Sequence, residues 1–105
     1  MPRFAANLSY LFTEVPIPER FAPARAAGFE AVEFHFPYEH EATLLSGRVR
    51  GAGVEVVLFN LHPGNWQAGE RGIACIPGRE AEFRASLARS VDYARALGCP
   101  RLNCL

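Results

Sequence analysis

Five polar residues stand at or near the carboxyl ends of apolar segments of this chain: Asn7, Glu33, His35, Asn60 and Asn103. The apolar segments predict parallel strands covered by helices, and such strands are otherwise almost wholly apolar. Polar side chains at the same end of neighbouring strands converge on one edge of a sheet, where they can hydrogen-bond to a small polar ligand. The alternative for each amide is that it satisfies a backbone group or a neighbouring strand.

Glu33 is the sharpest of these candidates. A carboxylate inside an apolar strand is costly to bury unless it is paired, coordinated or protonated. Glu33 therefore either orients a ligand or pairs with an arginine. The favoured interpretation is an ion pair that closes the interior of the barrel, with a partner in this chain or in the missing half. The three histidines, His35, His40 and His62, have neither helical ligand spacing nor a neighbouring cysteine pair, so we expect packing or solvated histidines and no self-contained metal site.

One long connection, from Leu61 to Gly78, carries further candidates. Long loops inside compact domains are usually functional. Trp66 is large enough to cover a small ligand or to pack the loop onto the rim of the fold, and rim packing is favoured. Arg71 has the paired donors that grip a carboxylate, the alternative being a salt bridge to Glu70 or another neighbour. The segment 69–72 lacks the lysine and hydroxyl residue of a phosphate loop, so nucleotide binding is unsupported.

These side chains must be positioned by a repeated unit of helix and strand. Three helix-like stretches end in glycine and run directly into an apolar segment, at Ala27-Gly28-Phe29, Ala52-Gly53-Val54 and Leu97-Gly98-Cys99. Glycine just past a helix takes the left-handed conformation that closes the last turn. With one more strand before the first helix, the pattern predicts an α/β fold of four parallel strands and three helices. This is about half of an eightfold barrel, whose usual size is roughly 250 residues.

The expected strands cover residues 3–8, 31–36, 54–61 and 101–105, and the expected helices cover 18–27, 41–52 and 79–97. Pro23 predicts a kinked, shortened or late-starting first helix, because proline in a helix interior costs about 3 kcal/mol. The spacing of apolar residues indicates which faces of the other helices are buried. In the second helix this face consists of Leu44, Leu45, Val49 and Ala52, and in the third of Phe83, Leu87, Val91, Ala94 and Leu97.

Composition restricts the classes of function. A chain of 105 residues with 50% hydrophobic residues can bury a core. Eleven basic and eleven acidic residues balance, which gives no electrostatic footprint for nucleic acid or a membrane surface, so a small molecule or a protein is the expected partner. No signal-like or membrane-spanning segment is visible, which predicts a cytoplasmic protein. The irregularly spaced Cys75, Cys99 and Cys104 favour reduced core thiols over disulfides.

Taken together, the motifs resemble the amino-terminal part of the hydroxypyruvate isomerase family, in the xylose isomerase-like TIM-barrel superfamily. The resemblance covers nearly the whole chain and rests on residues 3–9, 28–34, 36–38, 60–61 and 93–98. Its most specific part is the run from Ala68 to Glu80, Ala-Gly-Glu-Arg-Gly-Ile-Ala-Cys-Ile-Pro-Gly-Arg-Glu. The chain departs from the family at His62, where proline is usual, and at Asn65, where aspartate is usual.

The resemblance implies interconversion of hydroxypyruvate and tartronate semialdehyde, or of a related 2-oxo acid sugar. In the mechanism that the resemblance implies, a proton moves between adjacent carbons through an enediol, with two glutamates as acid and base. In the family those glutamates, and the ligands of a divalent metal such as Mg²⁺ or Mn²⁺, lie in later strands, beyond Leu105. We therefore expect residues 1–105 to be the amino-terminal half of one TIM-barrel domain, truncated and without turnover or a cofactor of its own. Neither Glu33 nor Glu70 matches a catalytic position. The candidate substrate contacts are Asn7, Glu33, Asn60, Trp66, Glu70 and Arg71.

A half barrel leaves its first and last strands unpaired and lacks the side chains that fill the opposite side of the interior. The expected partner is therefore the remaining barrel half or a second copy of the chain. The alternative function is a non-catalytic module that dimerises to close a barrel and at most binds a small carboxylate. Within the superfamily, a metal-dependent epimerase or an endonuclease acting on damaged DNA is a weaker alternative, and the balanced charge disfavours the DNA enzyme.

Overall fold

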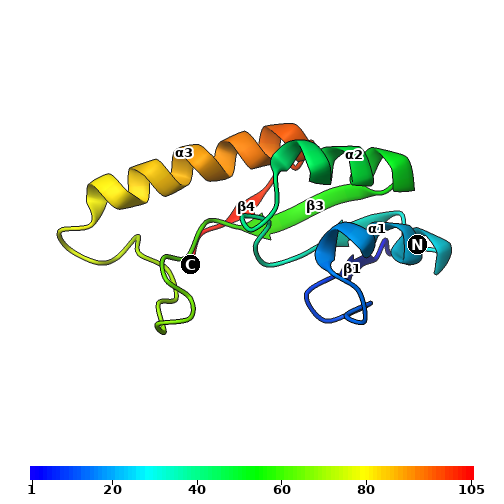
Figure 1. Ribbon diagram of the computed structural model, residues 1–105, viewed down its shortest axis with the longest axis horizontal. Helices are drawn as coiled ribbons and strands as arrows, with labels where there is room; N and C mark the ends of the chain where they lie inside the picture. Colours follow the sequence, from blue (N-terminus) through cyan, green and yellow to red (C-terminus); the bar gives the residue numbers. More distant parts are fainter.

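The computed structural model describes residues 1–105 as a four-stranded parallel sheet with helices packed along it (Figure 1). The strands are β1 (Ala5–Asn7), β2 (Ala31–Glu33), β3 (Glu55–Asn60) and β4 (Leu102–Asn103), and they lie side by side in chain order. A short 3₁₀ helix η1 (Ile17–Glu19) precedes the helices α1 (Phe21–Ala26), α2 (Ala42–Ala52) and α3 (Glu80–Leu97). The predicted α/β fold of four parallel strands and three helices is confirmed.

The predicted helix ends are confirmed by the backbone. Gly28, Gly53 and Gly98 have φ angles of 101°, 70° and 64°, in the region that a side chain disfavours. The first helix starts late, as Pro23 predicted, because α1 begins only at Phe21. Pro23 consequently lies in the first turn, where backbone N–H groups have no partner inside the helix, and the proline sacrifices no hydrogen bond there.

The core lies between the sheet and the helices. A cluster of 15 buried residues joins alternate strand positions, such as Val32 and Val56, to side chains from all three helices. Three aromatic rings form its centre: Phe34 stacks on Phe59 with ring centroids 5.8 Å apart, and Phe21 meets Phe34 edge-on at 6.1 Å. Since successive strand residues point to opposite faces, these buried positions leave the intervening residues on the face away from the helices.

Two predicted helix faces are partly wrong. In α2, Leu45 and Val49 are buried, but Leu44 is 44% exposed. In α3, only Ala94 and Leu97 of the predicted stripe are buried, and Leu87 is 37% exposed. The reason is length: the 18 residues of α3 extend about 27 Å, whereas the six of β3 extend about 20 Å. The first turns of α3 therefore run past the end of the sheet (Figure 1).

Two further expectations concern the cysteines and the membrane. All three cysteines are free thiols, but only Cys99 is buried, so the expectation of core thiols is wrong for Cys75 and Cys104. None of the helices combines the length and the apolar character needed to cross a membrane.

Candidate functional site

The polar residues at the strand ends form two couples. The Asn7 side-chain amide donates to Glu33 Oε1 at 3.1 Å, and the Asn103 amide donates to Asn60 Oδ1 at 3.0 Å. Both couples follow from the register, because Asn7 is paired with Glu33 and Asn60 with Asn103. The register between β2 and β3 shifts after Val32, so the two couples do not merge into one cluster. The predicted convergence therefore occurs within pairs of neighbouring strands.

Glu33 has no ion-pair partner within residues 1–105, so the interior ion pair favoured from the sequence would need an arginine from the remaining barrel half. The salt bridges of the structure join Arg3 to Glu55 and Arg79 to both Glu70 and Glu82. The Glu33 carboxylate is half-buried and accepts a hydrogen bond only at Oε1, from the Asn7 amide. Its Oε2 atom is consequently free to accept a hydrogen bond from a ligand hydroxyl.

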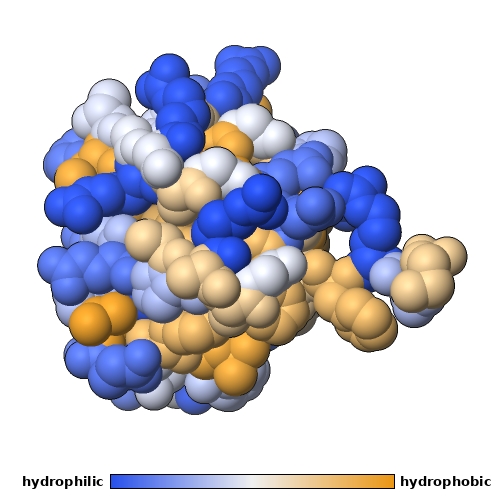
Figure 2. All heavy atoms as spheres, turned by 90° about the vertical axis from the view of Figure 1, so that its right-hand side faces the viewer, coloured by the Kyte–Doolittle hydropathy of each residue, from blue (hydrophilic) through white to orange (hydrophobic).

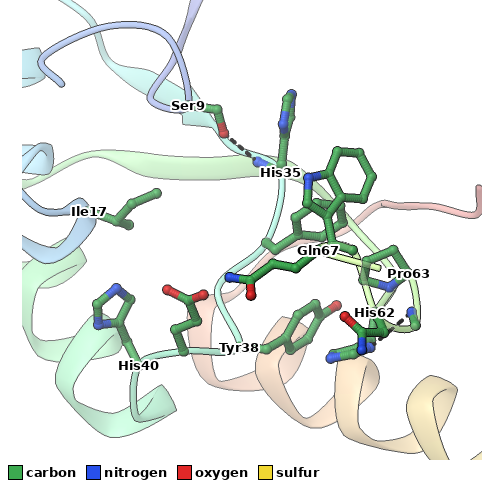
Figure 3. A pocket seen from close by; sticks show the side chains of 13 residues that line it. Ser9, Ile17, His35, Tyr38, His40, His62, Pro63 and Gln67 are labelled. Atoms are coloured by element: carbon green, nitrogen blue, oxygen red, sulfur yellow. Dashed lines mark hydrogen bonds between the residues drawn. The ribbon is translucent and has the colours of Figure 1, made fainter. Parts of the chain in front are cut away.

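A cavity of about 440 Å³ opens beside these strand ends, where the chain leaves β1, β2 and β3 (Figure 3). The Gln67 side chain extends into it, with Ile17 and His40 on one side and Tyr38 and His62 on the other. Most of its lining is polar or aromatic. The lining residues are Ser9, Ile17, His35, Phe36, Tyr38, Glu39, His40, His62, Pro63, Gly64, Asn65, Trp66 and Gln67.

His62 is held in one tautomer, and its surroundings disfavour the charged ring. Its Nδ1 atom accepts a hydrogen bond from the Gly64 N–H at 3.2 Å, so in the neutral ring the proton is on Nε2. Burial, and next the nearby Arg89 guanidinium, lower the pKa of His62. The ring is therefore a neutral hydrogen-bond donor rather than a cation.

Trp66 packs on the rim, as favoured from the sequence, and also lines the cavity. Its ring lies 4.9 Å from the ring of Phe36, and the Arg71 guanidinium covers it at 3.6 Å from the ring centroid. Arg71 also donates to the backbone carbonyls of Trp66 and Glu70, at 2.8 and 2.9 Å. The alternative of a salt bridge between Arg71 and the Glu70 carboxylate is wrong, because the contact is to the carbonyl.

Glu70 closes the long loop and does not line the cavity. Its carboxylate pairs with the Arg79 guanidinium and accepts the Asn65 N–H at 2.8 Å. The hydrogen bonds from Arg79, and then from Asn65, lower the pKa of Glu70. Asn65 in turn accepts the Ala68 N–H at its Oδ1 atom, at 3.1 Å. The asparagine thus still supports a turn, although aspartate is usual there in the family that the sequence resembles.

Metal binding has little support among these side chains. No group of three or more histidine, cysteine, aspartate or glutamate residues comes together in a way that could hold a metal ion. We therefore derive no step of chemistry through a metal held by residues 1–105.

Sequence reasoning missed three residues of the cavity, namely Ser9, Tyr38 and Gln67. It named His35 as a strand-end candidate but assigned all three histidines, His35, His40 and His62, to packing or solvent. One signal was present, since all six lie at the carboxyl end of a predicted strand, within a few residues after one, or in the long loop. The loops that follow the carboxyl ends of parallel strands are where such folds place their sites. The direction of each side chain, however, depends on contacts between loops far apart in sequence.

Known proteins resemble this chain over nearly its whole length. The model of the xylose isomerase-like TIM barrel family matches residues 21–105. A 2-oxo-tetronate isomerase of Cupriavidus necator is 52% identical over 103 residues, which are 98% of this chain and 40% of that protein. The hydroxypyruvate isomerase of Escherichia coli is 51% identical over 105 residues, which are 100% of this chain and 41% of that protein.

A solved structure is equally similar. The crystal structure of an AP endonuclease, family 2, from Brucella melitensis superimposes with a TM-score of 0.94 and 52% sequence identity. The match covers 97% of this chain and 40% of that one. The chain thus spans about two fifths of the length of the relatives that it matches.

Proposed function

Because this chain belongs to the xylose isomerase-like TIM barrel family, we propose that its strand ends and cavity form part of the active site of an isomerase. Its substrate is a short 2-oxo acid sugar, with hydroxypyruvate and 2-oxo-tetronate as the first candidates. The observation that carries the proposal is the identity of about half the residues to proteins named as isomerases of these two compounds.

The chemistry of the site supports a small hydroxylated substrate. Glu33 offers a free carboxylate oxygen as an acceptor, and His62 is a neutral donor beside a cavity that also presents the amide of Gln67. Trp66 supplies an apolar wall of fixed orientation. Such a mixture of acceptors, donors and one aromatic face suits a molecule with several hydroxyl groups.

Within this proposal, Asn7, Glu33, Asn60 and Trp66 contact the substrate, while Glu70 and Arg71 hold the loop that carries Trp66. The isomerisation transfers a proton between adjacent carbons through an enediol, and this needs an acid and a base close to the substrate. We assign that pair, and any Mg²⁺ or Mn²⁺ ligands, to strands outside these 105 residues. The relatives have the additional length that such strands require.

The proposal includes a partner for the sheet. β1 and β4 are the two edges of the sheet, and each has a neighbour on one side only. We propose that further strands cover these edges, either from the remainder of a barrel or from a second copy. Figure 2 looks onto the end of the molecule that carries the amino terminus, where apolar side chains gather over the lower part of the view, bordered by hydrophilic ones. The large exposed residues Met1 and Phe4 belong to this part of the chain.

The three free thiols agree with a reducing, cytoplasmic location.

An endonuclease is the competing function, because the similar solved structure carries that description. The charge of the chain favours the isomerase. Eleven basic residues are balanced by eleven acidic ones. Arg71 in the long loop and Arg79 just after it are engaged with Trp66 and Glu70. A DNA backbone needs unengaged cations to replace its counterions.

The experiment is a turnover assay of the full natural protein with hydroxypyruvate and with 2-oxo-tetronate, with and without added Mg²⁺ or Mn²⁺. Binding is measured in parallel from tryptophan fluorescence, to which Trp66 at the cavity contributes. We expect turnover of at least one compound and a fluorescence change on binding. Cleavage of abasic DNA without isomerisation of either compound would overturn the proposal.

A matched pair of variants tests the site itself. Glu33→Gln removes the free carboxylate acceptor at the carboxyl end of β2, whereas Glu55→Gln changes an exposed carboxylate at the opposite end of the sheet. We expect Glu33→Gln to lower kcat/KM by about tenfold or more, as for the loss of one hydrogen bond to a charged group. Glu55→Gln should leave kcat/KM unchanged, and equal effects of the two variants would contradict the placement of the site.

A further inference from the structure

A serine occupies the most buried position of α3 beside the cavity. Ser90 has no exposed surface, although the apolar stripe predicted for this helix did not include it. Its hydroxyl donates to the Ser86 carbonyl at 2.7 Å and accepts the His62 N–H at 3.2 Å. The Tyr38 hydroxyl makes a third contact with it, at 2.8 Å. One hydroxyl group therefore joins α3 to the segments that follow β2 and β3, and both segments line the cavity.

The contact with His62 decides where the chain goes after β3. The Leu61 N–H is the last one to bond across the sheet, to the Asn103 carbonyl at 2.9 Å. The next N–H, of His62, has Ser90 as its acceptor instead of a strand. Because a buried N–H without an acceptor is costly, Ser90 makes it favourable for the chain to leave the sheet here and turn along the cavity.

Two neighbours of Ser90 on the same helix hold the segment after β2. The Arg89 guanidinium donates to the Tyr38 carbonyl at 2.8 Å, and the Tyr93 hydroxyl donates to the His40 carbonyl at 2.5 Å. The rings of Tyr38 and Tyr93 also meet edge-on, with centroids 5.2 Å apart. Arg89, Ser90 and Tyr93 lie within about one turn of α3, and each of them contacts a residue that lines the cavity.

We propose that Arg89, Ser90 and Tyr93 are positioning residues, which fix the two cavity-lining segments in the geometry that binds substrate. This inference rests on the proposed function, since it concerns the same cavity. Ser90 is the central member, because it alone contacts both segments. The helix itself does not require this hydroxyl, since alanine is the better helix former.

The test compares Ser90→Ala with Ser86→Ala in the full natural protein. Ser86 lies one turn earlier in α3, and its hydroxyl bonds only to the Phe83 carbonyl, at 3.1 Å. The first readout is the hydrogen exchange of the His62 amide, which does not depend on turnover. We expect exchange in Ser90→Ala to be at least about fivefold faster, as for the loss of one hydrogen bond, and exchange in Ser86→Ala to be unchanged.

The second readout separates a positioning role from a merely structural one. In Ser90→Ala we expect KM for the isomerised substrate to rise about five- to tenfold while kcat changes less than about twofold. Ser86→Ala should leave both constants unchanged. Tyr38→Phe, which removes one hydroxyl and preserves the volume, should raise KM in the same direction, so the test does not depend on a single variant.

The results are decisive in each direction. Faster exchange with an unchanged KM in Ser90→Ala would mean that the hydroxyl serves only stability, and this would overturn the proposal. Equal effects of the two serine variants would overturn it as well. If the natural protein turns over neither compound, the proposed function fails. Affinity for hydroxypyruvate, measured from tryptophan fluorescence, then replaces KM. A weaker affinity in Ser90→Ala but not in Ser86→Ala supports the positioning role. The same affinity in Ser90→Ala as in the natural protein, or no binding by either, overturns it.

Discussion

Tyr38→Phe is the substitution whose effect can be worked out most fully from the structure. The phenol is buried, and its oxygen lies 2.5 Å from the Asn60 carbonyl and 2.8 Å from Ser90 Oγ. Ser90 keeps its other two partners in the variant, whereas the Asn60 carbonyl loses the contact with the phenol. The loss of one hydrogen bond together with an incompletely satisfied buried acceptor predicts a decrease of about 1–3 kcal/mol in the free energy of unfolding at pH 7.

The same substitution has an effect at high pH. Burial raises the pKa of Tyr38 from 10.0 to about 12. Below pH 10 the phenol is neutral in both states, so its contribution to stability is fully present. Between pH 10 and 12 the unfolded chain loses the proton first, and stability falls as pH rises. Two pKa units correspond to about 2.7 kcal/mol at most, and solvent screening reduces this to about 1–2 kcal/mol. Tyr38→Phe lacks this alkaline decrease.

The assay is urea unfolding of the natural protein and of Tyr38→Phe at pH 7 and at steps from pH 9 to 12, with a test that the m-value is unchanged. Tyr10→Phe is the control, because Tyr10 is 71% exposed. A loss below about 0.5 kcal/mol at pH 7 would refute the assigned hydrogen bonds. Identical alkaline slopes of the natural protein and Tyr38→Phe would refute the assignment of the slope to this phenol.

Three further predictions concern the helices and the long loop. Leu45→Ala should cost about 2–5 kcal/mol in urea unfolding, because Leu45 is fully buried, whereas the half-exposed Leu44→Ala should cost less than about 1 kcal/mol. Gly64→Ala and Gly69→Ala both place a side chain at positive φ, but only at Gly64 would the new methyl lie 2.8 Å from a neighbouring side chain. Gly64→Ala should therefore lower the melting temperature more than Gly69→Ala does. The ion pair of the Glu70 carboxylate stabilises the loop fully above the ordinary pKa of a glutamate, and this stabilisation is lost as pH falls through the lowered pKa of Glu70. Glu70→Gln should therefore accelerate proteolysis of residues 62–79 at neutral pH and have no effect in strong acid. Equal proteolysis of both proteins at pH 7 would contradict this.

The fold could be predicted from sequence because its signals are local. Gly53 and Gly98 end helices by their own backbone conformation, and Pro23 restricts α1 wherever the rest of the chain lies. The strand-end residues could be found for the same reason, since each follows an apolar run. How they pair could not, because the register shift after Val32 depends on how β2 meets β3.

The burial of Ser90 in place of Leu87 shows the same limit on a helix. Apolar spacing predicts which face of α3 is apolar, but not where along its length the helix leaves the sheet. That point depends on the difference in length between α3 and β3 and on the long loop that joins them. The first turns of α3 have no sheet to cover, so apolar side chains there stay partly exposed while a polar one nearer the strand end is buried.

This displacement of α3 past the sheet is also what gives the candidate site its walls. A helix that stopped at the end of β3 would cover the core and offer nothing to the segments that follow the strands. Because α3 overlaps the ends of β2 and β3, its side chains reach the carbonyls of Tyr38 and His40 and the amide of His62. Polar residues are required at these positions, since the groups that they meet are backbone donors and acceptors removed from water. The polar residues Arg89, Ser90 and Tyr93 in the middle of α3 are therefore explained by the position of this helix beside the candidate site.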